Sequence, residues 1–434
     1  MAKAGFGPRL VSGSGWGWSV ALLLTNGVYL AQMGLFRRAW QRLVAASSSV
    51  VLPKEGKEKL VSGKDLGAGF GKAEADFSFL PKKSFEEEPT PEPQRGPAFT
   101  IIIAARNEAE TLPGLLADLA AQLPVAGGFE VLIADDHSTD ATAPLVDRTA
   151  LEVTFPLRLL HLAKLPGAPT GKKAAVQAAI AAARAPWLLL TDADCRLPGG
   201  WVAAYARAVA AQPAARFISG PVLLTGSGWL ATLQGLELAG LVGVGAASIG
   251  RNAPTMCNGA NLAYRRQDFY AVQGFAGNEK VASGDDEFLL HKLHATFPGS
   301  IRFLADAAAL VQTPAQPTVR QLLRQRVRWA SKWRHYQTRA PQRLAVLVLL
   351  ANLTFPVGAG LWLVDVVPAS VVLLSWAAKL LADALLLRPV LQFLGRPRWL
   401  WWVPVLQLAY APYALLTGLA GLRGSYEWKG RQLR

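Results

Sequence analysis

An apolar segment near the start of this chain is long enough to cross a membrane. Residues Trp16–Phe36 carry no charged side chain. At about 1.5 Å per residue a helix of this length spans about 30 Å, the thickness of a hydrocarbon core. A signal peptide has a shorter apolar region and a more basic start, so we expect a membrane anchor within residues 1–50. Three arginines follow directly, at positions 37, 38 and 42, which places the downstream chain in the cytoplasm.

Residues 341–434 have membrane character again and predict a C-terminal transmembrane bundle of about three helices. The apolar segments are Leu344–Val364, Ala369–Leu387 and Trp399–Leu422. In the second of them, Lys379 and Asp383 are four residues apart, so they share a helix face and can pair inside the bundle. Together with the anchor, these segments predict an integral protein of the bacterial inner membrane or an equivalent membrane, with the domain between them in the cytoplasm.

The number of predicted membrane segments leaves the topology of the C-terminus open. One span before the central region and three after it would put a basic tail outside, against the positive-inside rule. That tail contains Arg423, Lys429, Arg431 and Arg434. Either one C-terminal segment does not cross the membrane, or the rule fails at this end.

The central region divides into a linker and an α/β domain. Residues 51–98 are rich in Lys, Glu, Gly and Pro without a sustained apolar period, which predicts a flexible linker. Residues 99–316 alternate short apolar runs with helical stretches, and this pattern predicts a doubly wound, mostly parallel sheet. The predicted strands are Phe99–Ala105, Phe129–Ala134, Leu157–Leu162 and Trp187–Thr191, and the helical stretches include Glu108–Gln122 and Lys172–Arg184.

Net charge and cysteine content narrow the class of protein. The formal charge of +15 fits nucleic acid, an anionic membrane surface or an anionic substrate. Part of it lies in a basic helix predicted over residues 317–340, next to the membrane segments, and no recognised nucleic-acid motif is present. We therefore expect membrane lipids as partners and no nucleic acid. Cys195 and Cys257 are the only cysteines, so a disulfide framework is not expected and both are interpreted as packing residues.

Carboxylates follow two of the predicted strands. Asp135 and Asp136 come after one, and Asp192 and Asp194 come after another. Ligands bind beyond the carboxyl ends of such strands, so both groups should face one crevice. Carboxylate oxygens suit Mg²⁺ or Mn²⁺, although an Asp-x-Asp segment also occurs in solvated loops. The sequence predicts a divalent metal held by Asp192 and Asp194.

Two further segments allow both a functional and a structural interpretation. Asp285 and Asp286 precede an apolar helix, where acidic residues suit the helix dipole, or one of them acts as a general base. Gln325, Arg328 and Trp329 lie in the basic helix. That helix either rests on anionic lipid or closes over a diphosphate and an acceptor, and both can hold for different faces.

Taken in order, these segments resemble glycosyltransferase family 2, in the membrane-bound branch that includes cellulose and hyaluronan synthases and ceramide glucosyltransferase. The resemblance covers about Thr100 to Tyr336. It rests on Ile103–Glu108, Asp135–Asp140, Gly171–Ala174, Asp192–Asp194, Asp285–Asp286 and Gln325–Trp329. His137 stands where the family usually has Gly, and Asp285–Asp286 stands where it commonly has Glu-Asp.

The resemblance implies a GT-A fold and an inverting, metal-dependent hexosyltransferase that uses a nucleotide-sugar, usually a UDP-sugar. Glu108 and Asp136, with Asp135 beside them, would bind the nucleoside, and Lys172 the base or diphosphate. Asp192 and Asp194 would hold donor and metal. Asp286, with Asp285 beside it, would deprotonate the acceptor. The remaining implied site residues are Gln325, Arg328 and Trp329 near the diphosphate and acceptor, and Asn258 and Gly259 in a loop that lines the pocket.

The acceptor is less constrained by the sequence. The span count resembles that of ceramide glucosyltransferase, and the apolar segment Trp229–Gly250 contains a single acid, Glu237. It can be an interfacial helix that admits a lipid or a helix of the core. We expect a lipid or lipid-linked acceptor. The alternatives are a processive polysaccharide synthase of the same family and a non-catalytic membrane scaffold with a degenerate transferase domain.

Overall fold

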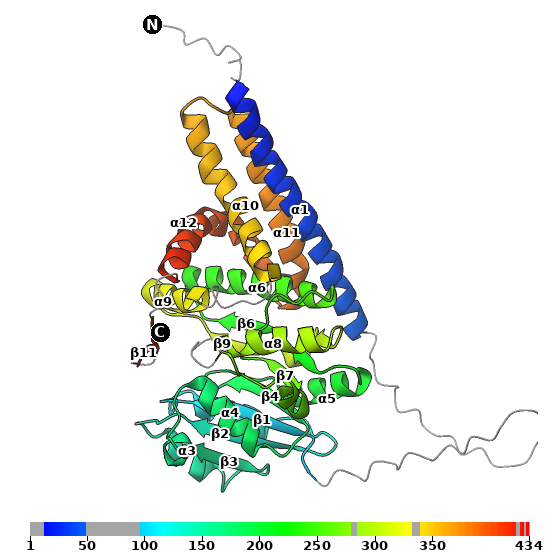
Figure 1. The fold of residues 1–434 in the computed structure, drawn as a ribbon, viewed down its shortest axis with the longest axis vertical. Helices are drawn as coiled ribbons and strands as arrows, with labels where there is room; N and C mark the ends of the chain where they lie inside the picture. The colour runs from blue at the N-terminus through cyan, green and yellow to red at the C-terminus, as the bar shows by residue number, and fades with distance from the viewer. Residues whose placement is uncertain are drawn as a thin grey trace, which may run out of the picture.

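The computed structural model describes residues 13–48, 96–278, 284–331, 339–421, 426–428 and 431–433. Most of the predicted linker, the second half of the predicted basic helix, and Arg423, Lys429 and Arg434 of the tail lie outside these residues. The chain forms an α/β body with a helical bundle that rises from one side of it (Figure 1). A long helix, α6 (Gly228–Gly250), lies across the foot of the bundle, between the bundle and the body (Figure 1).

The centre of the body is a seven-stranded sheet in the order β3-β2-β1-β4-β7-β5-β8. Its strands are β1 (Phe99–Ala105), β2 (Phe129–Asp135), β3 (Leu157–His161), β4 (Trp187–Asp192), β5 (Phe217–Ser219), β7 (Leu262–Arg265) and β8 (Ile301–Phe303). The first four pair in parallel, as their apolar runs predict. β7 runs antiparallel to both β4 and β5, so the sheet is mixed beyond β4.

Register brings acidic residues together at one edge of the sheet. At the end of β1, Ala105 pairs with Asp135 of β2, and Ala104 pairs with Asp192 of β4. Because all three strands are parallel, the carboxylates that follow β2 and β4 leave the sheet on the same side. The buried core beneath this edge is apolar, with Ile101, Ile103 and Leu189 fully buried.

Helices and a small second sheet surround the main sheet. The helices of the body are α2 (Leu112–Ala120), α3 (Thr142–Thr149), α4 (Lys172–Ala182), α5 (Trp201–Ala211), α6 (Gly228–Gly250), α7 (Arg266–Ala271), α8 (Asp285–Thr296) and α9 (Val319–Ala330), with the short turns η1 (Leu162–Lys164) and η2 (Ala307–Ala309). The second sheet pairs β6 (Val222–Thr225) in parallel with β9 (Val311–Pro314). β6 leads directly into α6, and β9 leads into α9, so this small sheet sets where both helices begin.

The bundle consists of α1 (Gly13–Ser48), α10 (Arg339–Leu363) and α11 (Ala369–Phe393). The predicted pair inside it forms: Lys379 Nζ lies 2.6 Å from Asp383 Oδ2. The hydroxyl of Tyr29 donates to Asp383 Oδ1 at 2.7 Å, and the amide of Gln407 donates to Oδ2 at 2.7 Å. A buried charge is tolerated in an apolar bundle when its hydrogen bonds are made, and this cluster ties three helices together.

The chain after α11 forms η4 (Pro397–Trp402), α12 (Val403–Gly421) and the strands β10 (Tyr426–Trp428) and β11 (Arg431–Leu433). α12 lies beside α6 and α9 rather than along the full length of the bundle (Figure 1). By length and composition, five segments in the described part of the chain can cross a membrane: Gly15–Ser47, Gly228–Gly250, Arg339–Leu363, Ala369–Phe393 and Pro397–Gly421.

Candidate active site

One cavity gathers the segments that the sequence singles out. It has a volume of about 1020 Å³ and lies between the carboxyl ends of β1 and β4 and the helices α6, α8 and α9. The predicted site residues on its wall are Glu108, Asp136, Lys172, Asp192, Asp194, Asn258, Gly259, Asp285, Asp286, Gln325, Arg328 and Trp329. This volume is at the upper end for small-molecule sites, so there is room for more than one substrate group.

Asp135 is the predicted residue that does not reach the cavity wall. Its carboxylate turns back and accepts a hydrogen bond from the backbone N–H of Ser138 at 3.1 Å, and it lies 3.7 Å from His161 Nδ1. The neighbouring Asp136 does face the cavity, and its Oδ2 accepts from the N–H of Gly171 at 3.0 Å. Of the two adjacent carboxylates, the first therefore shapes the turn and the second joins it to the start of α4.

Two tight turns at this edge hold each other. Asn107 Oδ1 accepts from the N–H of Thr139 at 2.8 Å, and the N–H of Asn107 donates to Ser138 Oγ at 2.9 Å. His137 has a φ of +59°. Glycine takes this left-handed conformation without strain, whereas a side chain costs energy there. The imidazole compensates through a contact of 3.1 Å between its Nδ1 and Asp136 Oδ1.

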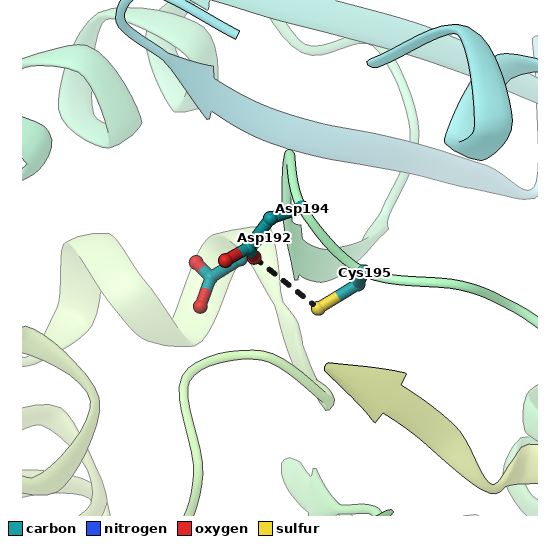
Figure 2. Close-up of side chains that lie close together, drawn as sticks. All are labelled: Asp192, Asp194 and Cys195. Carbon is teal, nitrogen blue, oxygen red and sulfur yellow. Dashed lines mark hydrogen bonds between the residues drawn. The ribbon is translucent and has the colours of Figure 1, made fainter. Parts of the chain in front are cut away.

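The Asp-x-Asp segment lies at the carboxyl end of β4. Asp192, Asp194 and Cys195 place one possible ligand atom each within 4.8 Å of one another (Figure 2). Lys172 is the first residue of α4, and its Nζ lies 2.5 Å from Asp192 Oδ1. Burial lowers the pKa of Lys172, but Asp192, Asp285 and Asp286 outweigh burial and hold that pKa above its ordinary value.

The donor set of this group fits a hard divalent cation. Burial, followed by repulsion from Asp192 and Glu108, raises the pKa of Asp194 to about 6. Repulsion between neighbouring carboxylates is relieved when a cation binds among them. Burial also raises the pKa of the Cys195 thiol, so this group stays protonated and is a poor ligand. The oxygens of Asp192 and Asp194 would therefore hold Mg²⁺ or Mn²⁺, with further positions left for waters or phosphate.

The start of α8 brings a second pair of carboxylates to the cavity. Asp285 and Asp286 are both half-buried in its first turn. Burial raises the pKa of Asp285, and the nearby Lys172 opposes that rise. Gly259 allows the close approach of this helix, because a Cβ added there would lie 3.2 Å from Asp286 Oδ2. The loop that contains Asn258 and Gly259 thus presses against the carboxylate of Asp286.

The segment Gln325–Trp329 is held by a buried network that the sequence did not reveal. Arg326, between Gln325 and Arg328, points away from the solvent and donates to Glu237 Oε2 through Nε at 3.0 Å and Nη2 at 2.7 Å. Tyr413 of α12 donates to Glu237 Oε1 at 3.0 Å. Glu237 is the lone acid of α6, and that isolation in an apolar helix was the one available signal of a buried partner.

Arg326 also fixes its own neighbours in the helix. Its Nη1 donates to Gln325 Oε1 at 2.5 Å, and its guanidinium lies 4.1 Å from the ring centre of Trp329. A cation over an indole face is attracted by the ring quadrupole. The side chains of Gln325 and Trp329, which line the cavity, are therefore oriented by a residue that lies behind them.

The far wall of the cavity is apolar. It is formed on α6 by Leu238, Leu241, Val242, Gly245 and Ala246. The segment predicted as an interfacial or a core helix is thus packed between body and bundle, with part of one face on the cavity. The carboxylates and the apolar wall belong to the same cavity.

Comparison with known proteins identifies relatives of this arrangement. The sequence model of glycosyl transferase family 2 matches residues 100–269, and that of glycosyl transferase family group 2 matches residues 187–416. Uncharacterized glycosyltransferases of Mycobacterium tuberculosis and Mycobacterium bovis are 31% identical over 105 residues, or 24% of this chain. The match spans 40% of the length of these relatives.

Among solved structures, a mannosyltransferase from Pyrobaculum calidifontis in complex with GDP-Man and Mn²⁺ is similar over 95% of this chain and 97% of its own. Its TM-score is 0.52 and its sequence identity 17%, a level that indicates a shared fold. The predicted α/β fold of the GT-A type with additional apolar helices is confirmed. Because the second family model alone covers more than half of the sequence, the chain belongs to glycosyltransferase family 2.

Proposed function

We propose that this protein transfers a sugar from a nucleotide-sugar to a lipid or lipid-linked acceptor at the membrane, with inversion at the sugar carbon. The observation that carries the proposal is the composition of the cavity described above. Its floor has the carboxylates that follow the strands of the sheet, and its far wall is the apolar face of α6. A diphosphate suits the carboxylate floor when a divalent cation binds between them, and an acyl or prenyl chain suits the apolar wall.

The donor is proposed to bind over the ends of β1, β2 and β4. Glu108 and Asp136 face the part of the cavity nearest the interlocked turns and suit the nucleoside. Lys172 and Arg328 supply positive charge for the diphosphate. The mannosyltransferase with a similar fold was solved with GDP-Man and Mn²⁺, which supports a nucleotide-sugar as donor and a divalent cation at Asp192 and Asp194. When bound, this cation would act as a Lewis acid for the leaving diphosphate.

Asp286 is proposed as the general base. A hydroxyl of the acceptor attacks the sugar carbon while its proton passes to the Asp286 carboxylate. The bond between the sugar and the diphosphate breaks, and Arg328 balances the charge that develops there. Attack from the face opposite the leaving group is a single displacement and inverts the carbon. Gly259 keeps the backbone close to this carboxylate and limits its motion.

The test is incubation of membranes that contain the protein with a panel of radiolabelled nucleotide-sugars. Organic extraction then separates lipid products from polymers. We expect label in the lipid fraction with the full-length protein and none with Asp286→Asn. Label in a polymer fraction would replace the lipid acceptor by processive synthesis. If no donor yields a product, the result supports the non-catalytic scaffold instead.

A further inference from the structure

The segment Pro397–Gly421 has the length and composition of a membrane span. It contacts the bundle where Gln407 donates to Asp383 of α11, yet it does not follow the bundle along its full length (Figure 1). The start of the segment is fixed on α6. The indole of Trp399 covers Gly235, where an added Cβ would lie 2.3 Å from a ring atom. Because α6 lies across the foot of the bundle (Figure 1), this contact places η4 at that level.

The middle of the segment returns to the same point of α6. Tyr413 donates to Glu237 Oε1 at 3.0 Å, and Glu237 is two residues from Gly235. In a helix that climbs straight through a membrane, Trp399 and Tyr413 would be about 20 Å apart along the axis. Contact of both side chains with one turn of α6 is incompatible with such a climb.

The end of the segment also lies at the cavity side. Gly421, the last residue of α12, packs against α9, where an added Cβ would lie 2.8 Å from Ala330 Cβ. The following strand β10 lies against α9 as well. Start, middle and end thus contact α6 or α9, and both of these helices line the cavity.

The outer face of α12 is a stripe of exposed apolar side chains. It consists of Val405, Leu408, Leu415, Leu416 and Leu419, all exposed. At about 100° per residue these five positions fall within roughly 100° of one another, on one side of the helix. Val403, Thr417 and Gly421 are buried on the opposite side. Trp401, just before the helix, is 85% exposed.

We propose that Pro397–Gly421 does not cross the membrane but lies within one leaflet, on the side of the catalytic cavity. The apolar stripe contacts the acyl chains of that leaflet, and Trp401 lies at its aqueous boundary, where indole rings are favoured. Only α1, α10 and α11 cross. The C-terminal tail is then on the same side as the cavity, and its arginines and lysine obey the positive-inside rule.

A comparison of two tags tests this topology, whichever way the protein faces. One epitope tag is inserted after Gly71 in the linker, and another is added after Arg434 in an otherwise intact chain. Sealed vesicles are treated with protease with and without detergent, and each tag is detected by antibody. Two crossings between the tags put both on one side, whereas a crossing by Pro397–Gly421 makes three and separates them.

We expect both tags to be cleaved or protected together. A tag at Arg434 on the side opposite to the linker tag would overturn the proposal. A third tag after Asp365, between α10 and α11, calibrates the assay, because it should always report the other side. If all sides are reversed, the cytoplasmic placement of the cavity fails but this proposal stands.

The lipid contact has a separate test with a matched pair of exposed leucines. A photoreactive amino acid replaces Leu415 of the stripe in one protein and Leu151, exposed at the end of α3, in the other. Vesicles that contain a radiolabelled phospholipid are irradiated. We expect labelled lipid on the protein altered at 415 and none on that altered at 151. Equal labelling of both, or of neither, would overturn the proposed contact.

Discussion

Burial decides how much the ion pair between Arg326 and Glu237 contributes to stability, and the chain contains a matched pair for comparison. Arg196 contacts Asp118 through Nε at 2.7 Å and Nη2 at 2.8 Å, much as Arg326 contacts Glu237. The arginine side chain is 5% exposed in the first pair and 62% exposed in the second. The two pairs thus have similar hydrogen bonds but different surroundings.

The expected cost of removing each arginine follows from that difference. Arg326→Gln leaves Glu237 as a buried carboxylate that keeps only its bond from Tyr413, and removing one partner of a buried pair costs about 3–5 kcal/mol. Arg196→Gln removes a charge that water already screens, which costs about 0–1 kcal/mol. The double variant Glu237→Gln/Arg326→Gln removes both charges and should recover a large part of the loss, because no uncompensated charge remains.

The assay is denaturant unfolding of the full-length protein in detergent micelles, followed by tryptophan fluorescence. The two single variants and the double variant are compared with the unaltered chain at one pH and salt concentration. If Arg196→Gln destabilises as much as Arg326→Gln, burial is not the controlling factor. If the double variant is less stable than Arg326→Gln alone, the buried charge is not the source of the cost.

The remaining predictions concern the reaction and its cation. Asp286→Asn should lower turnover by about 10²–10⁴-fold while donor affinity in a binding assay stays within a few-fold; normal turnover would exclude Asp286 as the base. Gly259→Ala should lower kcat more than it changes the KM for the donor, because its Cβ would lie 3.2 Å from Asp286 Oδ2, and an unchanged kcat would contradict that contact. A chelator should stop the transfer and added Mn²⁺ should restore it, whereas full activity in chelator would remove the cation from the proposal. Because burial and neighbouring carboxylates raise the pKa of Asp194 to about 6, Mn²⁺ affinity by calorimetry should fall below pH 6 by up to about tenfold per pH unit. In the metal-free protein the same raised pKa of Asp194 adds stability at low pH that is lost as the pH rises through 6. An Mn²⁺ affinity that does not change between pH 5 and pH 7 would refute both statements.

β1, β2 and β4 could be predicted from the sequence because they are buried on both faces. Such strands are continuous apolar runs; β2 and β4 end at Asp135 and Asp192, and the predicted bounds of β1 are those of the structure. The strands beyond β4 were not predicted, since β5 and β8 are three residues long. A run this short has no period of its own. Its place in the sheet comes from pairing with strands far away in the chain, as between Phe217 and Ile301.

The candidate site divides in the same way. Motif positions such as Asp192 and Asp286 could be chosen from the sequence because chemistry limits what stands at a strand end or a helix start. The different directions of Asp135 and Asp136 could not, because adjacent carboxylates are equivalent until the turn is built. The support of Gln325 and Trp329 was also hidden, since Arg326 and Glu237 are 89 positions apart and each alone is one charge among many.

The apolar helices show why composition does not determine topology. α6 and α1 are equally hydropathic over their most apolar windows, but 61% of the window of α6 is buried against protein and only 33% of that of α1. The apolar side chains of a helix are removed from water equally well by lipid and by packing between a sheet and a bundle. What separates the two cases is the partner of each small residue. Gly235 and Gly243 of α6 receive Trp399 and Val390, so this helix is packed between other parts of the protein. The same argument, applied to Gly421 at the end of α12, ties that end to α9 and supports a C-terminus on the cavity side.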